Sequence, residues 1–359
     1  MTNKTWHVIG LMSGTSLDGV DLVYAKFTLN QGYAFEILEK KSIVYSELWK
    51  NRLQNAFGYS GEKLTSLDAD YGKFLGELVL NFRLEKDIEK LDFVASHGHT
   101  IFHRPEQGYT LQIGSGAHLA AACKSKVICD FRTQDVALGG QGAPLVPIGD
   151  LLLFNAYGFC LNIGGFANIS YELDDQRIAY DICPTNIVLN HFTRKIGLEY
   201  DDGGIMASEG KISEELLLAL DGLEFYREEQ PKSLGYEFVV EVVLPIIDQY
   251  NLPIKDILRT FIEHAAHQIS EVINRAVAEM DKEATKVLIT GGGAYNTFMI
   301  ERIAALSKIE IEIPSKEIID FKEAIVFAFL GVLKDQGEVN CLKSVTGASW
   351  DHCGGVVYE

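Results

Sequence analysis

Residues 10–21 read GLMSGTSLDGVD and lie between two apolar, strand-like runs, His7–Ile9 and Leu22–Ala25. The small residues of this stretch and its carboxylates, Asp18 and Asp21, therefore fall in the turn of a predicted β-hairpin. Such a turn presents several backbone N–H groups to an anion such as phosphate. A carboxylate beside it can hold Mg²⁺ through water. Taken alone, the stretch is equally compatible with an ordinary glycine-containing hairpin.

Composition and charge limit the class of protein to which this chain can belong. The 359 residues suffice for two domains of ordinary size. A content of 47% hydrophobic and 23% charged residues is typical of a well-packed soluble protein. A formal net charge of −18 disfavours nucleic acid or an anionic membrane as the main partner, although a local site can still be positive.

Cellular location is inferred from features that the sequence lacks. Residues 1–10 show neither a long apolar core nor a small-residue cleavage site, so no signal peptide is evident. No apolar run approaches the ~20 residues that span a bilayer. The six cysteines have neither zinc-ribbon nor CxxC spacing and are interpreted as reduced core residues. These features favour a cytoplasmic protein.

The pattern of elements contains two further glycine-rich turns. Gly164–Asn168 joins strand-like runs, and Gly291–Gly293 ends a strand and opens a helix. The Gly/Pro loop 137–147 is the expected hinge or rim of the active site. Elsewhere the pattern predicts strands at 6–12, 20–29, 35–45, 93–96, 127–130, 159–163, 169–171 and 177–180 and helices at 62–85, 117–122, 211–222, 236–250, 254–281 and 320–335.

None of these turns fits a common phosphate or nucleophile signature. The sequence contains no GxxxxGK[ST], no complete GxGxxG and no GxSxG. Two hairpins on opposing domains can nevertheless hold a triphosphate from both sides, and the triple glycine lets an adenine approach the backbone closely.

Five motifs together resemble one family. GLMSGTSLDGVD (10–21), DFRTQDVALGGQGAPLVP (130–147), LNIGGFANIS (161–170), ITGGGAYN (289–296) and KEAIVFAFLG (322–331) resemble, in order and spacing, the anhydro-N-acetylmuramic acid kinases of the sugar kinase, Hsp70 and actin superfamily. The resemblance implies an α/β fold of two ribonuclease-H-like (actin/hexokinase-type) domains, each a mixed five-stranded sheet flanked by helices, with ATP in a central cleft. The expected lobes are 1–135 plus 336–359, and 136–335.

The resemblance also implies a reaction. Water opens the 1,6-anhydro ring of 1,6-anhydro-N-acetylmuramic acid, and the freed 6-oxygen takes the γ-phosphoryl group of ATP. The product is N-acetylmuramic acid 6-phosphate, an intermediate of peptidoglycan recycling. The family also suggests a homodimer.

ATP and Mg²⁺ are the implied cofactors. Asp18 and Asp21 are the candidate metal ligands, and Asp18 is favoured because it lies in the turn. The implied ATP-binding residues are Gly14, Thr15, Ser16, Leu17, Asp18, Gly19, Val20 and Asp21 in the first hairpin, Asn162, Gly164, Gly165 and Asn168 in the second, and Gly291, Gly292, Gly293 and Asn296 at the adenosine end.

Two carboxylates are the candidate catalytic residues. Asp181 closes a predicted strand, at the kind of strand end where α/β sites gather, and matches the family's catalytic aspartate. An ionised carboxylate there can take a proton from the attacking water. Glu323 matches a family glutamate and is expected to bind a sugar hydroxyl or help place the water. The alternatives to catalysis are structural. Asp181 would then cap a helix or turn, and Glu323 would be a solvated glutamate in the first turn of its helix.

Arg132 and His97 are the remaining expected sugar ligands, beside Asp181 and Glu323. The Arg132 guanidinium can hold the lactyl carboxylate of the sugar with two hydrogen bonds, and a salt bridge to a neighbouring aspartate is the alternative. His97 matches a family histidine and is expected to hydrogen-bond the sugar. Metal binding by the histidines around position 97 is disfavoured because no cysteine or acidic ligand lies near them in sequence.

The chain departs from the family pattern around Asp181. Residues 181–186 read DICPTN, so Ile182, Cys183 and Thr185 carry side chains where the family has Thr, Gly and Gly. Close backbone approach or a positive φ would be lost or strained there. A related anhydrosugar such as levoglucosan is therefore an alternative substrate. The sequence is also compatible with a hexokinase-type enzyme for an ordinary sugar hydroxyl and with a non-catalytic ATP-binding module of the actin/Hsp70 type.

Overall fold

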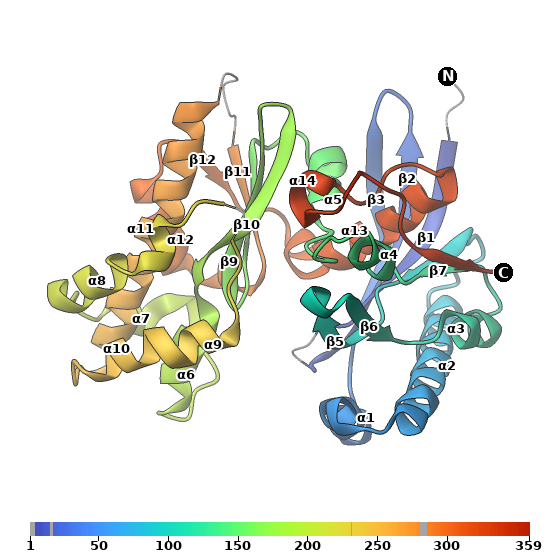
Figure 1. Cartoon of the computed structure of the whole chain (residues 1–359), viewed down its shortest axis with the longest axis horizontal. Coiled ribbons are helices and arrows are strands. Elements are labelled where there is room, and N and C mark those ends of the chain that lie inside the picture. The colour runs from blue at the N-terminus through green and yellow to red at the C-terminus, as the bar shows by residue number, and fades with distance from the viewer. Residues whose placement is uncertain (1–3, 15–16, 231, 281–285) are drawn as a thin grey trace. The chain divides into compact units, whose positions relative to one another are not determined.

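The structure, a computed structural model, describes residues 4–14, 17–230, 232–280 and 286–359 (Figure 1). The chain divides into two compact units, unit 1 with Met1–Leu153 and Phe321–Glu359, and unit 2 with Phe154–Asp320. This division differs from the expected lobes because residues 136–153 and 321–335 belong to unit 1. The loop 137–147, expected as a hinge or active-site rim, therefore lies inside unit 1.

Unit 1 is built on a mixed sheet with the strand order β13-β7-β4-β1-β2-β3. β1, β2 and β3 are antiparallel neighbours, β4 and β7 run parallel to β1, and β13 pairs antiparallel with β7. The sheet thus has six strands where five were expected, because the C-terminal residues add β13 at its edge. The strands are β1 (Lys4–Met12), β2 (Gly19–Leu29), β3 (Tyr33–Val44), β4 (Phe93–Ser96), β7 (Val127–Cys129) and β13 (Val356–Tyr358).

Helices cover both faces of this sheet because side chains alternate along its strands. Ile9 and Leu11 belong to the core that contains α2 and α3. Gly10 faces α13, and a Cβ at this position would lie 2.3 Å from the carbonyl oxygen of Ala324. The missing side chain therefore lets α13 lie directly on β1. The helices of unit 1 are α1 (Glu47–Asn55), α2 (Gly61–Glu85), α3 (Gly116–Cys123), α4 (Thr133–Ala137), α5 (Pro147–Leu153), α13 (Lys316–Gln336, which starts in unit 2) and α14 (Lys343–Thr346).

Unit 2 repeats the same plan with the strand order β10-β9-β8-β11-β12. β8, β9 and β10 are antiparallel neighbours, and β11 and β12 run parallel to β8. This order and these directions match β3-β2-β1-β4-β7 of unit 1, which confirms the α/β fold of two ribonuclease-H-like domains. The strands are β8 (Phe159–Ile163), β9 (Phe166–Leu173), β10 (Gln176–Pro184), β11 (Lys286–Thr290) and β12 (Glu310–Glu312).

The helices of unit 2 pack around α11, whose apolar side chains lie in the core against β9 and β10. They are α6 (Asn186–Arg194), α7 (Ile205–Ser208), α8 (Glu214–Asp221), α9 (Tyr236–Phe238), α10 (Leu244–Asp248), α11 (Ile254–Glu279) and α12 (Thr297–Leu306). The helix expected at 236–250 contains a π-helical turn, η5 (Val239–Val243), between α9 and α10. Pro245 follows that turn and cannot donate a backbone hydrogen bond, which disfavours a regular ladder there.

The sequence pattern missed one hairpin in unit 1, which β5 (His99–Arg104) and β6 (Tyr109–Ile113) form as a separate two-stranded sheet. Within the described parts of the chain, none of the helices combines the length and the apolar character that crossing a bilayer requires.

Candidate functional site

The first hairpin joins β1 to β2, with Met12 paired to Asp21. Buried hydrogen bonds hold the start of the turn, because the Ser13 hydroxyl lies 2.6 Å from the Tyr45 hydroxyl and 2.9 Å from Nδ1 of His99. Leu17 has a φ of 61°, a left-handed conformation that turns the chain toward β2. Thr15 and Ser16, two of the predicted ATP-binding residues, lie outside the described residues.

The remaining hairpin residues differ in what they can offer a ligand. Asp18 is exposed at the end of the turn, whereas Val20 is buried in the core and presents only its backbone. Gly19 sits in β2 opposite Val44. Oδ1 of Asp21 accepts a hydrogen bond from the Ser42 hydroxyl at 2.5 Å. The acidic groups therefore face the solvent side of the hairpin and the apolar groups face the core.

Glu323 lies well inside α13, so it is not a first-turn glutamate. Its side chain is accessible to solvent although protein surrounds it on most sides. This partial desolvation raises its pKa, and the Asp21 carboxylate raises it further, while the Arg132 and Lys322 cations act in the opposite direction. Lys322 itself is buried and forms an ion pair with Asp150 at 2.7 Å. Glu323, Asp21 and Arg132 thus form one electrostatically coupled group on unit 1.

Arg132 is held by uncharged partners. Its Nε donates to Nε2 of His97 at 3.0 Å, and its Nη1 donates to the carbonyl oxygen of Gly142 at 2.7 Å. Among the described residues it forms no salt bridge, so the expected alternative of an ion pair with Asp130 or Asp135 is not found. Burial lowers the pKa of Arg132 to about 10, so the guanidinium stays cationic at neutral pH. A buried cation of this kind is available to an anionic ligand.

His97 has a positioning role in this structure. Its Nδ1 donates to the Gly98 carbonyl oxygen at 2.9 Å, which leaves Nε2 as the acceptor for Arg132. Burial and the neighbouring guanidinium hold the pKa of His97 well below its usual range, so the ring is neutral. Both ring nitrogens have protein partners, so His97 orients Arg132. The expected hydrogen bond from His97 to a sugar would require one of these two hydrogen bonds to break.

The second hairpin joins β8 to β9 through Gly164 and Gly165. The hydroxyl of Thr185 donates to the Gly164 carbonyl oxygen at 2.9 Å, and the backbone N–H of Thr185 donates to the Gly165 carbonyl oxygen at 2.8 Å. The N–H of Gly165 forms no hydrogen bond within the described parts of the chain, and Gly165 is exposed. The turn therefore keeps its carbonyls occupied and an N–H available to an anion.

A row of polar side chains crosses the sheet of unit 2 beside this turn. Thr290 pairs with Asn162, Asn162 with Asn168, and Asn168 with Asp181, on four neighbouring strands. Because residues in register on adjacent strands share a face, these groups lie side by side. The sequence-predicted residues Asn162, Asn168 and Asp181 are thereby brought together.

Asp181 lies where β10 is irregular. The pairing register shifts between Asp181 and Cys183, so Ile182 forms a bulge. Oδ2 of Asp181 accepts from the Leu234 backbone N–H at 2.9 Å, and its other carboxylate oxygen has no hydrogen-bond partner among the described residues. Burial raises the pKa of Asp181, and the Leu234 N–H opposes this shift. The residue is thus a half-buried carboxylate of increased basicity with one oxygen available.

The unusual residues next to Asp181 face the protein interior. Ile182, Cys183 and Thr185 are all buried, and none of them has a positive φ. The expected positive φ is therefore not found at these positions. The residues that depart from the family pattern thus lie in the core of unit 2, whereas Gly165 of the turn is exposed.

The third glycine-rich turn packs on the second hairpin. A Cβ on Gly291 would lie 2.5 Å from Oδ1 of Asn162, and a Cβ on Gly293 would lie 2.2 Å from Cγ2 of Ile163. A Cβ on Gly292 would have only the Asn186 amide nitrogen near it, at 3.9 Å. Asn296 caps α12, because its Oδ1 accepts from the Met299 N–H at 3.0 Å. The predicted adenosine residues are thus next to the predicted phosphate turn.

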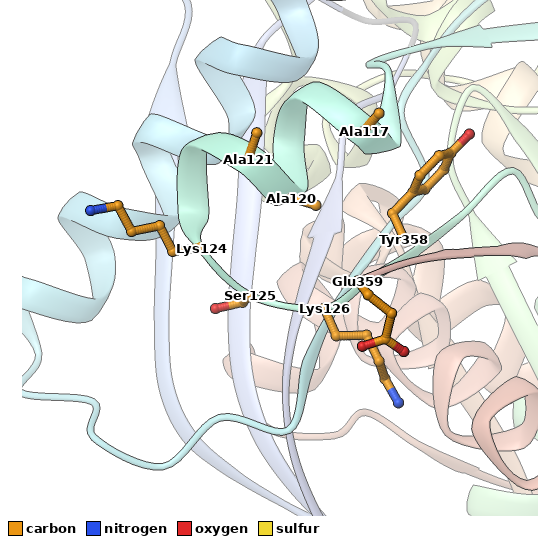
Figure 2. A pocket seen from close by; sticks show the side chains of 8 residues that line it. All are labelled: Ala117, Ala120, Ala121, Lys124, Ser125, Lys126, Tyr358 and Glu359. Carbon is orange, nitrogen blue, oxygen red and sulfur yellow. The ribbon is translucent and has the colours of Figure 1, made fainter.

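Sequence reasoning missed the backbone groups that hold the two central side chains, namely the Leu234 N–H at Asp181 and the Gly142 carbonyl at Arg132. The local sequence carries no signal for either contact. A surface pocket of unit 1 lies between α3 and the C-terminal residues and is lined in part by Lys124, Lys126 and Tyr358 (Figure 2). None of the sequence-predicted site residues lines it.

Comparison with known proteins supplies the family. The family model described as anhydro-N-acetylmuramic acid kinase matches residues 6–359. Proteins with that name from Shewanella sp. strain MR-7 and Shewanella oneidensis are each 35% identical to this chain and cover 97% of it and 96% of their own length. A glucokinase from Streptomyces griseus, solved with glucose and AMPPNP, aligns over 90% of this chain and 98% of its own with 9% identity and a TM-score of 0.40. The chain belongs to the anhydro-N-acetylmuramic acid kinase family.

Proposed function

We propose that this chain is an ATP-dependent kinase that opens the 1,6-anhydro ring of 1,6-anhydro-N-acetylmuramic acid and phosphorylates its 6-oxygen. The observation that carries the proposal is Asp181, a half-buried carboxylate with a raised pKa, in register with Asn168 of the hairpin around Gly164 and Gly165. The family membership of residues 6–359 supports the same reaction.

Asp181 acts as the base. The Leu234 N–H fixes one carboxylate oxygen, and the other accepts a proton from the water that attacks the anomeric carbon. As the new C1–O bond forms, the bond from C1 to the bridging oxygen breaks, and that oxygen becomes the free 6-oxygen. The 6-oxygen then bonds to the γ-phosphorus of ATP, and ADP leaves. The raised pKa of Asp181 strengthens it as a proton acceptor.

Unit 1 supplies groups for the sugar. The Arg132 guanidinium binds the lactyl carboxylate, and His97 keeps the guanidinium in position. Glu323 accepts a hydrogen bond from a sugar hydroxyl or from the attacking water.

ATP is held by the three glycine-rich turns. The available N–H of Gly165 binds a phosphate oxygen, and the turn at Gly291–Gly293 lets adenine approach the backbone. The residues around the first turn fit Mg²⁺, because the Asp18 and Asp21 carboxylates offer the oxygen ligands and the negative charge that this ion requires. When bound, Mg²⁺ neutralises charge that develops on the β- and γ-phosphates.

The proposal includes a cytoplasmic location, a homodimer, and ATP and the anhydrosugar as the ligands, without nucleic acid or membrane. The family suggests the dimer, and the net charge of −18 disfavours polyanionic partners. Light scattering coupled to size-exclusion chromatography tests the oligomeric state, and a mass of one chain would refute the dimer.

The principal experiment is Asp181→Asn. The amide retains the shape and an acceptor for the Leu234 N–H but cannot take the proton, so kcat falls by roughly 10²–10⁴ while the Kd for ATP is unchanged. The control is Asp248→Asn, which alters an exposed carboxylate of the same unit. Turnover by Asp181→Asn at the wild-type rate would refute the base assignment.

Arg132→Gln separates the candidate sugars. Levoglucosan lacks the lactyl carboxylate, so this variant should raise KM only for the muramic substrate. Equal KM changes for both sugars would contradict carboxylate binding at Arg132. Wild-type activity on free N-acetylmuramic acid alone would favour a hexokinase-type reaction, and tight ATP binding without turnover of any of the sugars would favour a non-catalytic module.

A further inference from the structure

Unit 1 contains a buried cluster that the proposed reaction does not use. It consists of Asp135, Cys341 and His352, whose side chains are 0%, 2% and 5% exposed. One oxygen, sulfur or nitrogen atom from each lies within 4.8 Å of the others. These are three of the side-chain types that bind zinc in proteins.

The backbone fixes two members of this cluster as a pair. Cys341 and His352 form an antiparallel bridge in which each backbone N–H donates to the other residue's carbonyl, at 3.0 and 3.1 Å. Residues paired in this way carry their side chains on the same face. Asp135, from α4, completes the cluster and accepts from the Gly142 N–H through Oδ2 and from the Thr346 hydroxyl through Oδ1, both at 2.7 Å.

Two atoms of the cluster, Nε2 of His352 and Oδ1 of Asp135, face each other as hydrogen-bond acceptors with no proton between them. Nδ1 of His352 donates to the Trp350 carbonyl oxygen at 3.3 Å, so in the neutral ring Nε2 carries a lone pair. Nε2 is buried and has no hydrogen-bond partner among the described residues. It lies 3.7 Å from Oδ1 of Asp135. A cation between the two atoms satisfies both.

We propose that Asp135, Cys341 and His352 bind one Zn²⁺, through Oδ1, Sγ and Nε2. Zn–N and Zn–O bonds of about 2.0–2.2 Å in tetrahedral geometry place Nε2 and Oδ1 about 3.3–3.6 Å apart. The separation of 3.7 Å between these atoms lies just above this range, so a small side-chain movement brings both within bonding distance of one ion. On binding, the Cys341 thiol loses its proton to solvent and the thiolate bonds to the metal. Water takes the fourth position.

The ion has a structural effect on the Arg132 loop. Asp135 holds the Gly142 N–H, and the Gly142 carbonyl oxygen accepts from Arg132. Zn²⁺ at Asp135 thereby links the C-terminal segment, which carries Cys341 and His352, to the loop that orients the guanidinium. The ligands come from two separate parts of the chain, α4 and the C-terminal segment, so binding stabilises the fold of unit 1.

The test uses full-length, untagged protein, stripped with a chelator and kept free of Mg²⁺ and nucleotide. Titration with Zn²⁺ should give one bound equivalent and raise Tm as the zinc concentration increases. Co²⁺ in place of Zn²⁺ should give an absorption band from charge transfer between thiolate and metal. Cys341→Ser should abolish that band, and His352→Gln should weaken zinc binding at least tenfold. Cys123 is another buried cysteine of unit 1, and Cys123→Ser should change neither the cobalt absorption band nor the affinity for zinc.

The wild-type titration decides the proposal even if a variant fails to fold. Folded wild-type protein that binds no zinc at micromolar concentrations, or a cobalt spectrum without a thiolate band, would overturn it. The cluster would then be a buried aspartate and histidine packed beside a thiol. Because the readouts are metal content, spectrum and Tm, the result is independent of the kinase reaction.

Discussion

The two hairpins share one strand–turn–strand plan and offer different chemistry. The first turn, between β1 and β2, is long and carries side-chain groups, with Asp18 exposed and Asp21 bonded to Ser42. The second turn, between β8 and β9, consists of Gly164 and Gly165 and offers backbone alone. The same topology thus supplies fixed charge in unit 1 and an open backbone N–H, that of Gly165, in unit 2.

This difference assigns separate tasks to the hairpins. Carboxylates in the first suit a hydrated cation, and bare backbone in the second suits a phosphate oxygen. Charge beside the second hairpin comes from Asp181 on β10, one strand away from the turn. If the assignment is correct, changes in the first hairpin should alter metal dependence, and changes in the second should alter nucleotide binding or stability.

Among the variants of the two hairpins and their support, Asp21→Asn is expected to have the largest effect. It removes a carboxylate from the candidate metal site, so kcat should fall about 100-fold and half-saturation should need more Mg²⁺. It also removes a charge that raises the pKa of Glu323, so the acid limb of kcat/KM should move to lower pH. Kinetics over a Mg²⁺ series and a pH series check both effects. Asp70→Asn, an exposed carboxylate of unit 1, is the control. Unchanged metal dependence would contradict the assignment.

Gly293→Ala should damage the support of the second hairpin. The new methyl group would lie 2.2 Å from Cγ2 of Ile163, in the core of unit 2. Overpacking of this kind costs about 1–3 kcal/mol. Thermal unfolding should show a lower Tm, by roughly 2–4 °C for each kcal/mol lost. Gly292→Ala is the matched control, because its Cβ has only the Asn186 amide nitrogen near it, at 3.9 Å. Equal melting temperatures for the two variants would show that the turn shifts to accommodate the new methyl group without loss of stability.

Elements governed by local periodicity could be predicted from the sequence. The helix expected at 62–85 spans Gly61–Glu85, and the strand expected at 20–29 spans Gly19–Leu29. β13 was missed because three exposed residues at the C-terminus carry no alternation, and only pairing with β7 makes them a strand. The same holds for β6, which depends on its partner β5.

The sequence supplied candidate site residues but not their contacts. Asp181 and Arg132 were found from motifs, but the Leu234 N–H that holds Asp181 is 53 positions away along the chain. The substitutions after Asp181 were interpreted as backbone strain, whereas the bulge at Ile182 turns these side chains into the core. Sequence spacing does not show on which side of a strand an irregularity places its residues.

Gly165→Ala should separate binding from folding in the second hairpin. A Cβ there would meet only Cβ of Ile187, at an ordinary 3.6 Å, so Tm should not change. The methyl group stands on the exposed edge of the turn and hinders close approach of phosphate, so KM for ATP should rise about tenfold. Isothermal titration with an ATP analogue checks the affinity. Wild-type affinity would place the phosphates elsewhere.

The smallest expected effect concerns stability, again at Asp181. Its pKa is raised in the folded protein above the ordinary value of 3.8, so the folded state binds this proton more tightly than the unfolded chain. The ionised carboxylate therefore destabilises the fold. The penalty is absent below pH 3.8, grows as pH rises through the folded pKa, and is complete above it. Asn carries no such penalty.

Asp181→Asn should consequently unfold at a higher urea concentration than wild type at pH 7, and its advantage should shrink as pH falls toward 4. The exposed Asp248→Asn should show no comparable trend. A pH-independent difference would mean that the Leu234 hydrogen bond cancels the effect of desolvation on the pKa of Asp181, and a disadvantage of the variant that grows with pH would mean that the hydrogen bond outweighs desolvation. A stability gain together with lost turnover would show that unit 2 keeps this carboxylate at a cost in folding energy, whereas the backbone turn beside it carries no charge and no such penalty.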